Sequence, residues 1–123
     1  MKHHKIELDK LGFMQGRLLP KFQGKFQAHP IDTWEKEFSL ANKYKLRNIE
    51  FIIDAYKAEL NPLINFSGIN KIKKLEKKYN VKVSSICADY FMENPIHLKG
   101  VRNNYPLEFL KILVIASKKL KIK

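Results

Sequence analysis

The stretch from Asn48 to Tyr56 constrains the fold most, because it is an apolar, β-branched run that ends in a carboxylate and an aromatic ring. Side chains alternate along a strand, so every second residue shares a face. One face carries only apolar side chains, those of Ile49, Phe51 and Ile53. The other face carries two acids, Glu50 and Asp54, on either side of Ile52. The run predicts a buried parallel strand with helices on its apolar face and chemistry at its carboxyl end.

Two further segments repeat this unit. Residues 11–15 form a short apolar run closed by Gly16, and residues 81–89 form an apolar run that ends in Asp89. Helical patterns occupy residues 33–44, residues 67–79 and the chain from Pro106 onward. Strands that alternate with helices predict a parallel sheet built from right-handed crossovers, with the strand of residues 48–56 in the middle.

The helix ends and buried stripes can also be placed. Asp32 with Glu35 predicts a capping box for the first helix, Ser67 predicts the cap of the second, and Asn80 suits its left-handed stop. The apolar stripes comprise Trp34, Phe38, Ala41 and Tyr44, then Ile69, Ile72, Leu75 and Tyr79, then Leu107, Leu110, Leu113, Val114 and Leu120. The second helix should turn Lys71, Lys74, Lys77 and Lys78 outward.

The connection over residues 18–31 is longer than a scaffold needs, because strand-to-helix loops in such units typically have about 2 to 6 residues. Long loops often cover or line a site. Gln23 and Gly24 suggest a small hairpin within it. Phe22 and Phe26 are either lid residues or anchors of the loop, and we favour anchors.

Composition limits the partners. The net charge of +12 attracts polyanions, but only three of the 24 basic residues are arginines, Arg17, Arg47 and Arg102. We therefore disfavour nucleic acid and interpret the lysines as solvated surface. Cys87 is the single cysteine, so no intramolecular disulfide forms, and no window has the ~20 apolar residues of a membrane span. These features predict a cytoplasmic protein without a membrane partner.

Five segments carry a family resemblance: Gly12-Phe13-Met14-Gln15-Gly16-Arg17-Leu18, Asp32-Thr33-Trp34-Glu35, Ile49-Glu50, Asp54-Ala55-Tyr56 and Cys87-Ala88-Asp89-Tyr90-Phe91-Met92. In this order and spacing they resemble the sugar phosphate isomerase/epimerase family, which has a xylose isomerase-like TIM barrel. The resemblance spans residues 1–123 and implies the first three strand–helix units of an α/β barrel. A whole barrel needs ~250 residues, so an amino-terminal, incomplete part of the domain is expected.

The resemblance also implies a chemistry. Such enzymes commonly hold one divalent metal with Glu, Asp, His and Glu ligands and move a proton through an enediolate. Those ligands would lie beyond this chain, so no metal ligand and no catalytic residue is assigned within it. The residues expected to bind the sugar or sugar phosphate are Gln15, Arg17, Glu50, Asp54, Asp89 and Tyr90.

Several of these roles remain open. Arg17 either holds a substrate phosphate or carboxylate or forms an ion pair with Glu50 or Asp54. Glu50 lies early in its strand, so a structural role is favoured. Cys87 has no paired histidine in the sequence and is interpreted as a small buried side chain. Lys45 stands where the family often has glycine, which predicts strain at a left-handed position.

Three functions are weighed. The first is a metal-dependent isomerase or epimerase to which this chain contributes substrate contacts, and the chain by itself would be inactive. The second is an endonuclease-type relative on the same barrel, which would show a steep loss of DNA binding with salt. The third is a non-catalytic, degenerate half-barrel that self-associates to cover its sheet edges.

Overall fold

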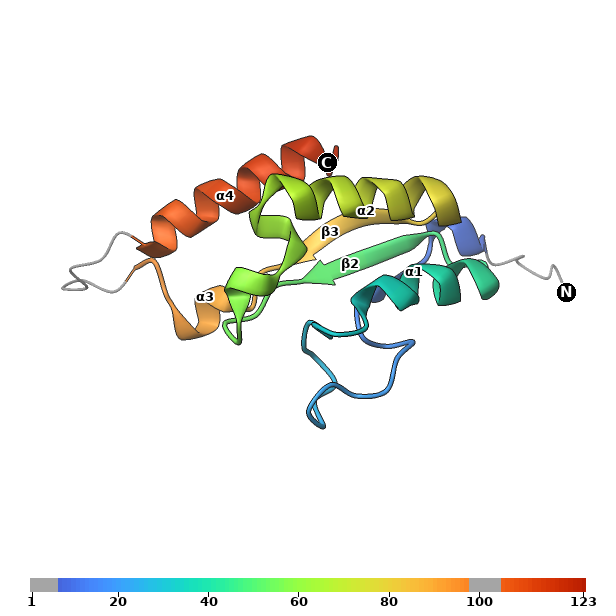
Figure 1. The fold of residues 1–123 in the computed structure, drawn as a ribbon, viewed down its shortest axis with the longest axis horizontal. Coiled ribbons are helices and arrows are strands. Elements are labelled where there is room, and N and C mark those ends of the chain that lie inside the picture. The colour runs from blue at the N-terminus through green and yellow to red at the C-terminus, as the bar shows by residue number, and fades with distance from the viewer. Residues whose placement is uncertain (1–6, 98–104) are drawn as a thin grey trace, which may run out of the picture.

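The computed structural model describes residues 7–97 and 105–123, drawn in Figure 1. Within these residues the chain is an α/β protein with three strands and four α-helices, together with three short 3-10 turns. The strands and helices are β1 (Gly12–Met14), α1 (Trp34–Lys43), β2 (Asn48–Ile52), α2 (Phe66–Tyr79), β3 (Lys82–Cys87), α3 (Tyr90–Glu93) and α4 (Tyr105–Lys119). The 3-10 turns are η1 (Leu8–Lys10), η2 (Ala58–Leu60) and η3 (Pro62–Ile64).

The three strands form one parallel sheet in the order β1-β2-β3, as predicted. Asn48 at the start of β2 pairs with Gly12 of β1 and with Lys82 of β3, so all three strands begin at one level. The register shifts by one residue between Ile49 and Glu50, where β3 carries an extra residue. All strands are shorter than predicted, and β2 ends at Ile52, four residues before Tyr56.

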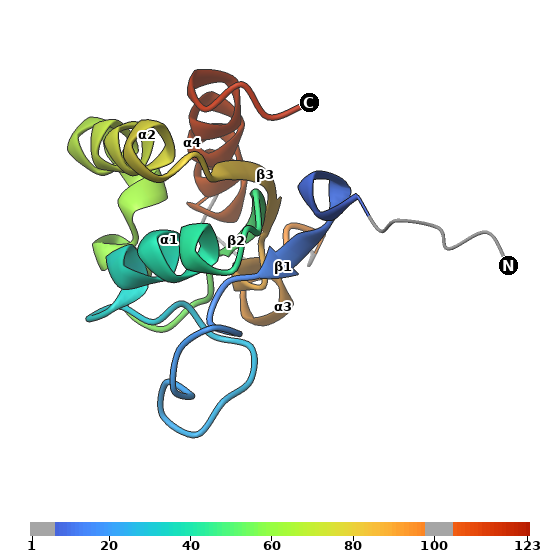
Figure 2. The same cartoon turned by 90° about the vertical axis from the view of Figure 1, so that its right-hand side faces the viewer.

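Helices α1, α2 and α4 lie on one side of the sheet (Figure 2). The predicted apolar face of β2 is fully buried beneath them, with Ile49, Phe51 and Ile53 each at 0% exposure. These side chains pack with Phe38 of α1 and Phe109 of α4 in one core. The opposite face of β2 carries Glu50, which is half-buried, so the two faces have the polarity that the sequence predicted.

Two of the predicted helix caps are wrong. The N-cap of α1 is Thr33 rather than Asp32, it makes no side-chain capping bond, and Glu35 instead forms an ion pair with Lys71 at 2.6 Å. The N-cap of α2 is Asn65 rather than Ser67, and its side chain accepts a hydrogen bond from the Gly68 N–H at 2.7 Å. An Asn at the cap satisfies the first turn as well as Ser would, and the helix therefore starts two residues earlier.

The buried stripes are confirmed in part. Trp34, Phe38 and Ala41 are buried, but Tyr44 is 56% exposed because α1 ends at Lys43. In α4 the buried residues are Phe109, Leu113 and Ala116, and Leu120 directly after the helix is also buried, as predicted. Leu107, Leu110 and Val114 are exposed, so the prediction for those three residues is wrong. In a helix rich in apolar residues, composition alone does not identify the face that packs.

The left-handed stop at Asn80 is confirmed, with φ of 52°. Lys71, Lys74, Lys77 and Lys78 are exposed as predicted. Among residues 7–97 and 105–123, no helix is both long and apolar enough to cross a membrane.

Candidate functional site

The turn that follows β1 is fixed by a buried carboxylate. Glu37 of α1 is 0% exposed, and its carboxylate accepts hydrogen bonds from the Gly16 N–H at 2.8 Å and the Leu18 N–H at 3.0 Å. Gly16 has φ of 91°, a conformation that side chains disfavour. Burial raises the pKa of Glu37, and the two backbone donors oppose that shift. This carboxylate therefore sets the direction in which the chain leaves the carboxyl end of β1.

Gln15 is completely buried at that end of the sheet. Its Oε1 accepts a hydrogen bond from the Ile52 N–H at 3.0 Å and lies 3.0 Å from His29 Nδ1. The His29 ring is 2% exposed and packs against Phe51, with ring centroids 5.5 Å apart. Burial lowers the pKa of His29 to about 4, so the ring is neutral at pH 7. Gln15 thus joins β1, β2 and the loop, which indicates a structural role for its oxygen.

Two buried nitrogens beside this bond, Gln15 Nε2 and His29 Nε2, have no hydrogen-bond partner among the described residues. A buried polar atom without a partner is costly, so such atoms often mark a water or ligand contact. These two nitrogens can still form hydrogen bonds, and they belong to residues that meet at the carboxyl ends of β1 and β2.

Asp54 follows β2 and lies half-buried above this pair. Its Oδ2 accepts a hydrogen bond from the His29 N–H at 3.0 Å. Burial raises the pKa of Asp54; the His29 N–H and the charge of Lys25 oppose the shift, and Asp89 adds to it. Asp54 and Asp89 follow the adjacent strands β2 and β3, and the charge of Asp89 adds slightly to the rise in the pKa of Asp54.

Asp89 follows β3 and is bound from two directions. Its Oδ2 accepts a hydrogen bond from Gln27 Nε2 at 2.5 Å, and Cys87 Sγ lies 3.4 Å from its Oδ1. Burial, together with Asp89 and Glu50, raises the pKa of the Cys87 thiol to about 11. The thiol is therefore protonated at neutral pH, which argues against a nucleophilic role.

These residues form two hydrogen-bonded sets that follow the carboxyl ends of the strands, and we term them together the carboxyl-end cluster. Its members are Gln15, Gln27, His29, Asp54, Cys87 and Asp89. Three of them, Gln15, Asp54 and Asp89, were predicted as substrate contacts and lie just beyond strand ends. The loop over residues 18–31 contributes Gln27 and His29. The cluster offers carboxylate and amide oxygens that accept hydrogen bonds from hydroxyl groups.

The loop over residues 18–31 follows the prediction in part. Phe22 and Lys25 form an isolated antiparallel bridge around Gln23 and Gly24, both with positive φ, so the expected hairpin is present. Phe22 lies half-buried with its ring 6.2 Å from that of Tyr56, as an anchor would. Phe26 is 65% exposed and lies under the cations of Lys21 and Arg17, so the anchor interpretation fails for this residue.

Arg17 lies beside the cluster without joining it. Its Nη1 donates to the Phe26 carbonyl oxygen at 2.7 Å, and the side chain is exposed. Within the described part of the chain it forms no ion pair with Glu50 or Asp54, so that alternative is not supported. Its Nη2 also lies 4.0 Å from Met14 Sδ, a weak acceptor that an anionic ligand would readily replace.

The other two predicted contacts occupy different surroundings. Glu50 is half-buried on the inner face of β2, near enough to the Cys87 thiol to affect its pKa. Tyr90 is 5% exposed, and its ring stacks on Phe109 with centroids 3.9 Å apart, so the ring belongs to the core beneath α4. Of the six predicted contacts, the structure places Gln15, Asp54 and Asp89 in the cluster.

Sequence reasoning did not identify the three residues that connect the loop and α1 to the strands. Gln27 lies 62 positions from Asp89, His29 lies 14 from Gln15, and Glu37 lies 21 from Gly16. The one available signal was the length of the loop, which predicts a site without indicating which side chains reach it. In the described residues, no group of three His, Cys, Asp or Glu side chains could hold a metal ion.

Comparison with known proteins identifies no family for this chain. Neither a scan against protein-family models nor a search of the curated proteins found a match.

Proposed function

We propose that this chain supplies the substrate-binding side of a sugar or sugar-phosphate isomerase or epimerase built on a xylose isomerase-like TIM barrel. In this proposal β1, β2 and β3 with their helices are the first three units of the barrel. The parallel strand order and the helices on one side of the sheet are compatible with such units.

The observation that carries the proposal is the position of Asp54 and Asp89, which follow the carboxyl ends of the adjacent parallel strands β2 and β3. Ligands of parallel α/β folds bind at this end of the sheet. The two carboxylates, with the Gln27 amide, provide paired acceptors and donors of the kind that sugar hydroxyls require. Arg17 beside them provides donors for a phosphate group.

The divalent metal of the family does not fit the described residues, because they contain no suitable ligand group. We therefore assign the proton transfer to none of them. The functional contribution of this chain, in our proposal, is to bind and orient the sugar, and the metal and the acid–base groups come from elsewhere in the enzyme.

Binding of a sugar by the chain tests this proposal. In a titration with fructose 6-phosphate followed by amide chemical shifts, we expect changes at Gln27, Asp54 and Asp89. Asp89→Asn should weaken binding at least roughly fivefold, because a carboxylate accepts hydrogen bonds more strongly than an amide. Glu93→Gln, an equivalent change on exposed α3, is the control. Equal effects of both variants, or shifts elsewhere only, would contradict the proposal.

Arg17→Ala separates the phosphate contact from the sugar contact. The variant should weaken fructose 6-phosphate and leave fructose unchanged, because its guanidinium would act on the phosphate alone. Unchanged affinity for both ligands would remove Arg17 from the site.

The barrel itself is tested by the intact mass of the endogenous protein: a mass about twice 14.5 kDa is expected for a ~250-residue barrel. A mass of 14.5 kDa would favour the self-associating alternative.

A further inference from the structure

A second candidate site lies at the opposite end of the sheet. A cavity of about 750 Å³ opens between the amino ends of β2 and β3 and the carboxyl ends of α2 and α4. Ligand pockets commonly have volumes of about 300 to 1,000 Å³, so the space suits a small molecule. Six basic residues line it: Arg47, Lys73, Lys77, Lys82, Lys119 and Lys121. Two acids, Asp9 and Glu76, also line it.

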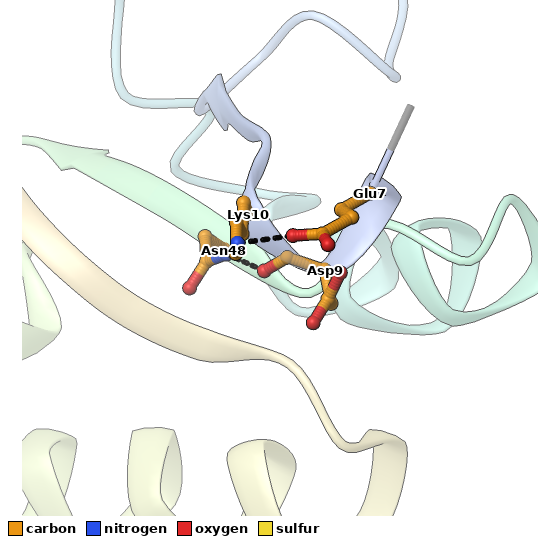
Figure 3. Close-up of polar contacts among 4 residues, drawn as sticks. All are labelled: Glu7, Asp9, Lys10 and Asn48. Carbon is orange, nitrogen blue, oxygen red and sulfur yellow. Dashed lines mark hydrogen bonds and ion pairs between the residues drawn. The ribbon is translucent and has the colours of Figure 1, made fainter. Parts of the chain in front are cut away.

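Asn48 and Asp9 line one side of the cavity. Figure 3 shows the hydrogen bond that joins them. Asn48 Nδ2 donates to the Asp9 carbonyl oxygen at 2.7 Å and to the Leu11 carbonyl oxygen at 3.2 Å. An ion pair between Glu7 and Lys10 closes the same turn, η1. The Asp9 carboxylate points away from Asn48 in this view. These contacts of the turn do not involve the five lysines that line the cavity.

The basic residues divide into two groups by their contacts. Arg47 donates to Asn42 Oδ1 at 2.9 Å and to the carbonyl oxygen of Asn80 at 3.2 Å, so it caps α2. The Lys119 ammonium lies over the Phe66 ring at 4.4 Å. Within the described chain the remaining four form no ion pair with a carboxylate: Lys73, Lys77, Lys82 and Lys121. Glu76, which also lines the cavity, accepts a hydrogen bond from the Val83 N–H at 2.9 Å. Burial raises the pKa of Glu76, and that hydrogen bond and the charges of Lys82 and Lys73 oppose the shift.

The net charge of the lining shows whether these lysines do more than offset the partial negative charges of the helix ends. Cations at helix carboxyl ends are expected, because each end carries about half a negative charge. Six basic and two acidic lining residues give 6 − 2 = +4, and two helix ends offset about one of those charges. An excess of about three positive charges remains in one concave surface, where it attracts anions more strongly than on a flat surface.

We propose that this cavity binds the polyphosphate group of a small organic ligand. Two or three linked phosphates carry about three or four negative charges near neutral pH, because each linked phosphate bears one and the terminal one bears part of a second, so their charge is comparable to the excess of the lining. Val81 and Leu120, both buried, supply an apolar part of the lining against which the organic part can pack. This site lies at the other end of the strands from the carboxyl-end cluster and does not depend on the proposed function.

Calorimetric titration of the chain with sodium tripolyphosphate and with ATP, in phosphate-free buffer, tests the site. The double variant Lys73→Gln/Lys77→Gln should weaken both ligands roughly tenfold, because it removes two lining charges. Lys74→Gln/Lys78→Gln is the matched control, since it makes the same changes with the same spacing on the same helix outside the cavity. We expect it to change affinity less than roughly twofold.

Each outcome bears on the proposal. Tighter binding of ATP than of tripolyphosphate, or equal binding, supports it and tells whether the organic part contributes. Equal weakening by the two double variants would overturn it, because generic attraction to a +12 protein would then explain the binding. Absence of binding, or binding of sulfate as tight as that of tripolyphosphate, would overturn it as well. Lys82→Gln, in a strand instead of a helix, repeats the test where helix stability is not affected.

Discussion

His29 is the buried residue of the carboxyl-end cluster whose protonation links the stability of the fold to pH. It is buried, and burial lowers its pKa from 6.5 to about 4. Between these values the unfolded chain binds a proton at residue 29 that the folded chain does not. The contribution of His29 to the free energy of unfolding is therefore fully present above about pH 6.5. It is lost as the pH falls from about 6.5 to about 4.

Replacing His29 by Asn should flatten the fall of stability with acid. Asn keeps a donor near the position of Nδ1 for Gln15 Oε1, but it does not titrate. We expect the free energy of unfolding lost between pH 7 and pH 4 to shrink by at most about 3 kcal/mol, the value of the pKa shift. Urea unfolding at several pH values measures this. His97→Asn, at an exposed position, is the control, and equal slopes for both variants would contradict the prediction.

Lys45 has the strained, left-handed backbone conformation that the family resemblance predicted. It has φ of 59° directly after α1, in the left-handed region. Lys45→Gly should raise the free energy of unfolding by about 0.5 to 1 kcal/mol, because glycine adopts this conformation without steric cost. Asn80→Gly at the end of α2, with φ of 52°, is the matched comparison. Its gain should be smaller, since asparagine tolerates this region, and the reverse order in thermal unfolding would contradict the account.

At the scale of elements, α1 holds the turn after β1 through Glu37. Glu37→Ala leaves the Gly16 and Leu18 N–H groups without their acceptor and should cost about 2 to 4 kcal/mol. Glu35→Ala on the same helix removes an exposed ion pair with Lys71 and should cost less than about 1 kcal/mol. Chemical denaturation of both variants makes the comparison. Similar losses would mean that the Glu37 carboxylate does not hold this turn.

The contact between α2 and η3 depends on Gly68. A Cβ atom there would lie 2.2 Å from the Pro62 carbonyl oxygen and 2.5 Å from its Cα, and backbone atoms cannot move aside cheaply. Replacing a helical glycine by alanine normally gains up to about 1 kcal/mol. Gly68→Ala should instead lose about 2 kcal/mol or more. Ser67→Ala, exposed at the preceding position, should be nearly neutral, and a gain at Gly68 in the same unfolding assay would overturn this packing.

Sequence reasoning succeeds for elements whose signal is local. The alternating pattern at residues 49–53 predicted both faces of β2, and Asn80 predicted the end of α2. It fails where two local solutions compete, as for Asn65 against Ser67 at the cap of α2. Contacts such as that between Gln27 and Asp89 join residues 62 positions apart, and no local pattern encodes them. Three of the six cluster residues, Gln15, Asp54 and Asp89, were therefore predictable from the strand ends. The two that the loop supplies, Gln27 and His29, were not.

At the scale of the whole molecule, basic residues outnumber acidic residues by two to one. The chain has 24 basic and 12 acidic residues. Among the described residues there are three ion pairs, all of them exposed: Lys10–Glu7, Lys71–Glu35 and Lys111–Glu108. Exposed pairs contribute little, so repulsion among the lysines is not offset by local attraction. The compact state is consequently destabilised by its own charge at low ionic strength.

Salt should therefore stabilise this protein. Raising NaCl from about 20 mM to about 300 mM shortens the screening length and should raise the free energy of unfolding by roughly 1 kcal/mol. The double variant Lys36→Glu/Lys74→Glu lowers the net charge from +12 to 12 − 4 = +8 at exposed helix positions, and its stability should depend less on salt. Urea unfolding at each salt concentration, without phosphate, gives both slopes. If stability fell with salt instead, attraction would outweigh repulsion, and the interpretation of the lysines as a merely solvated surface would fail.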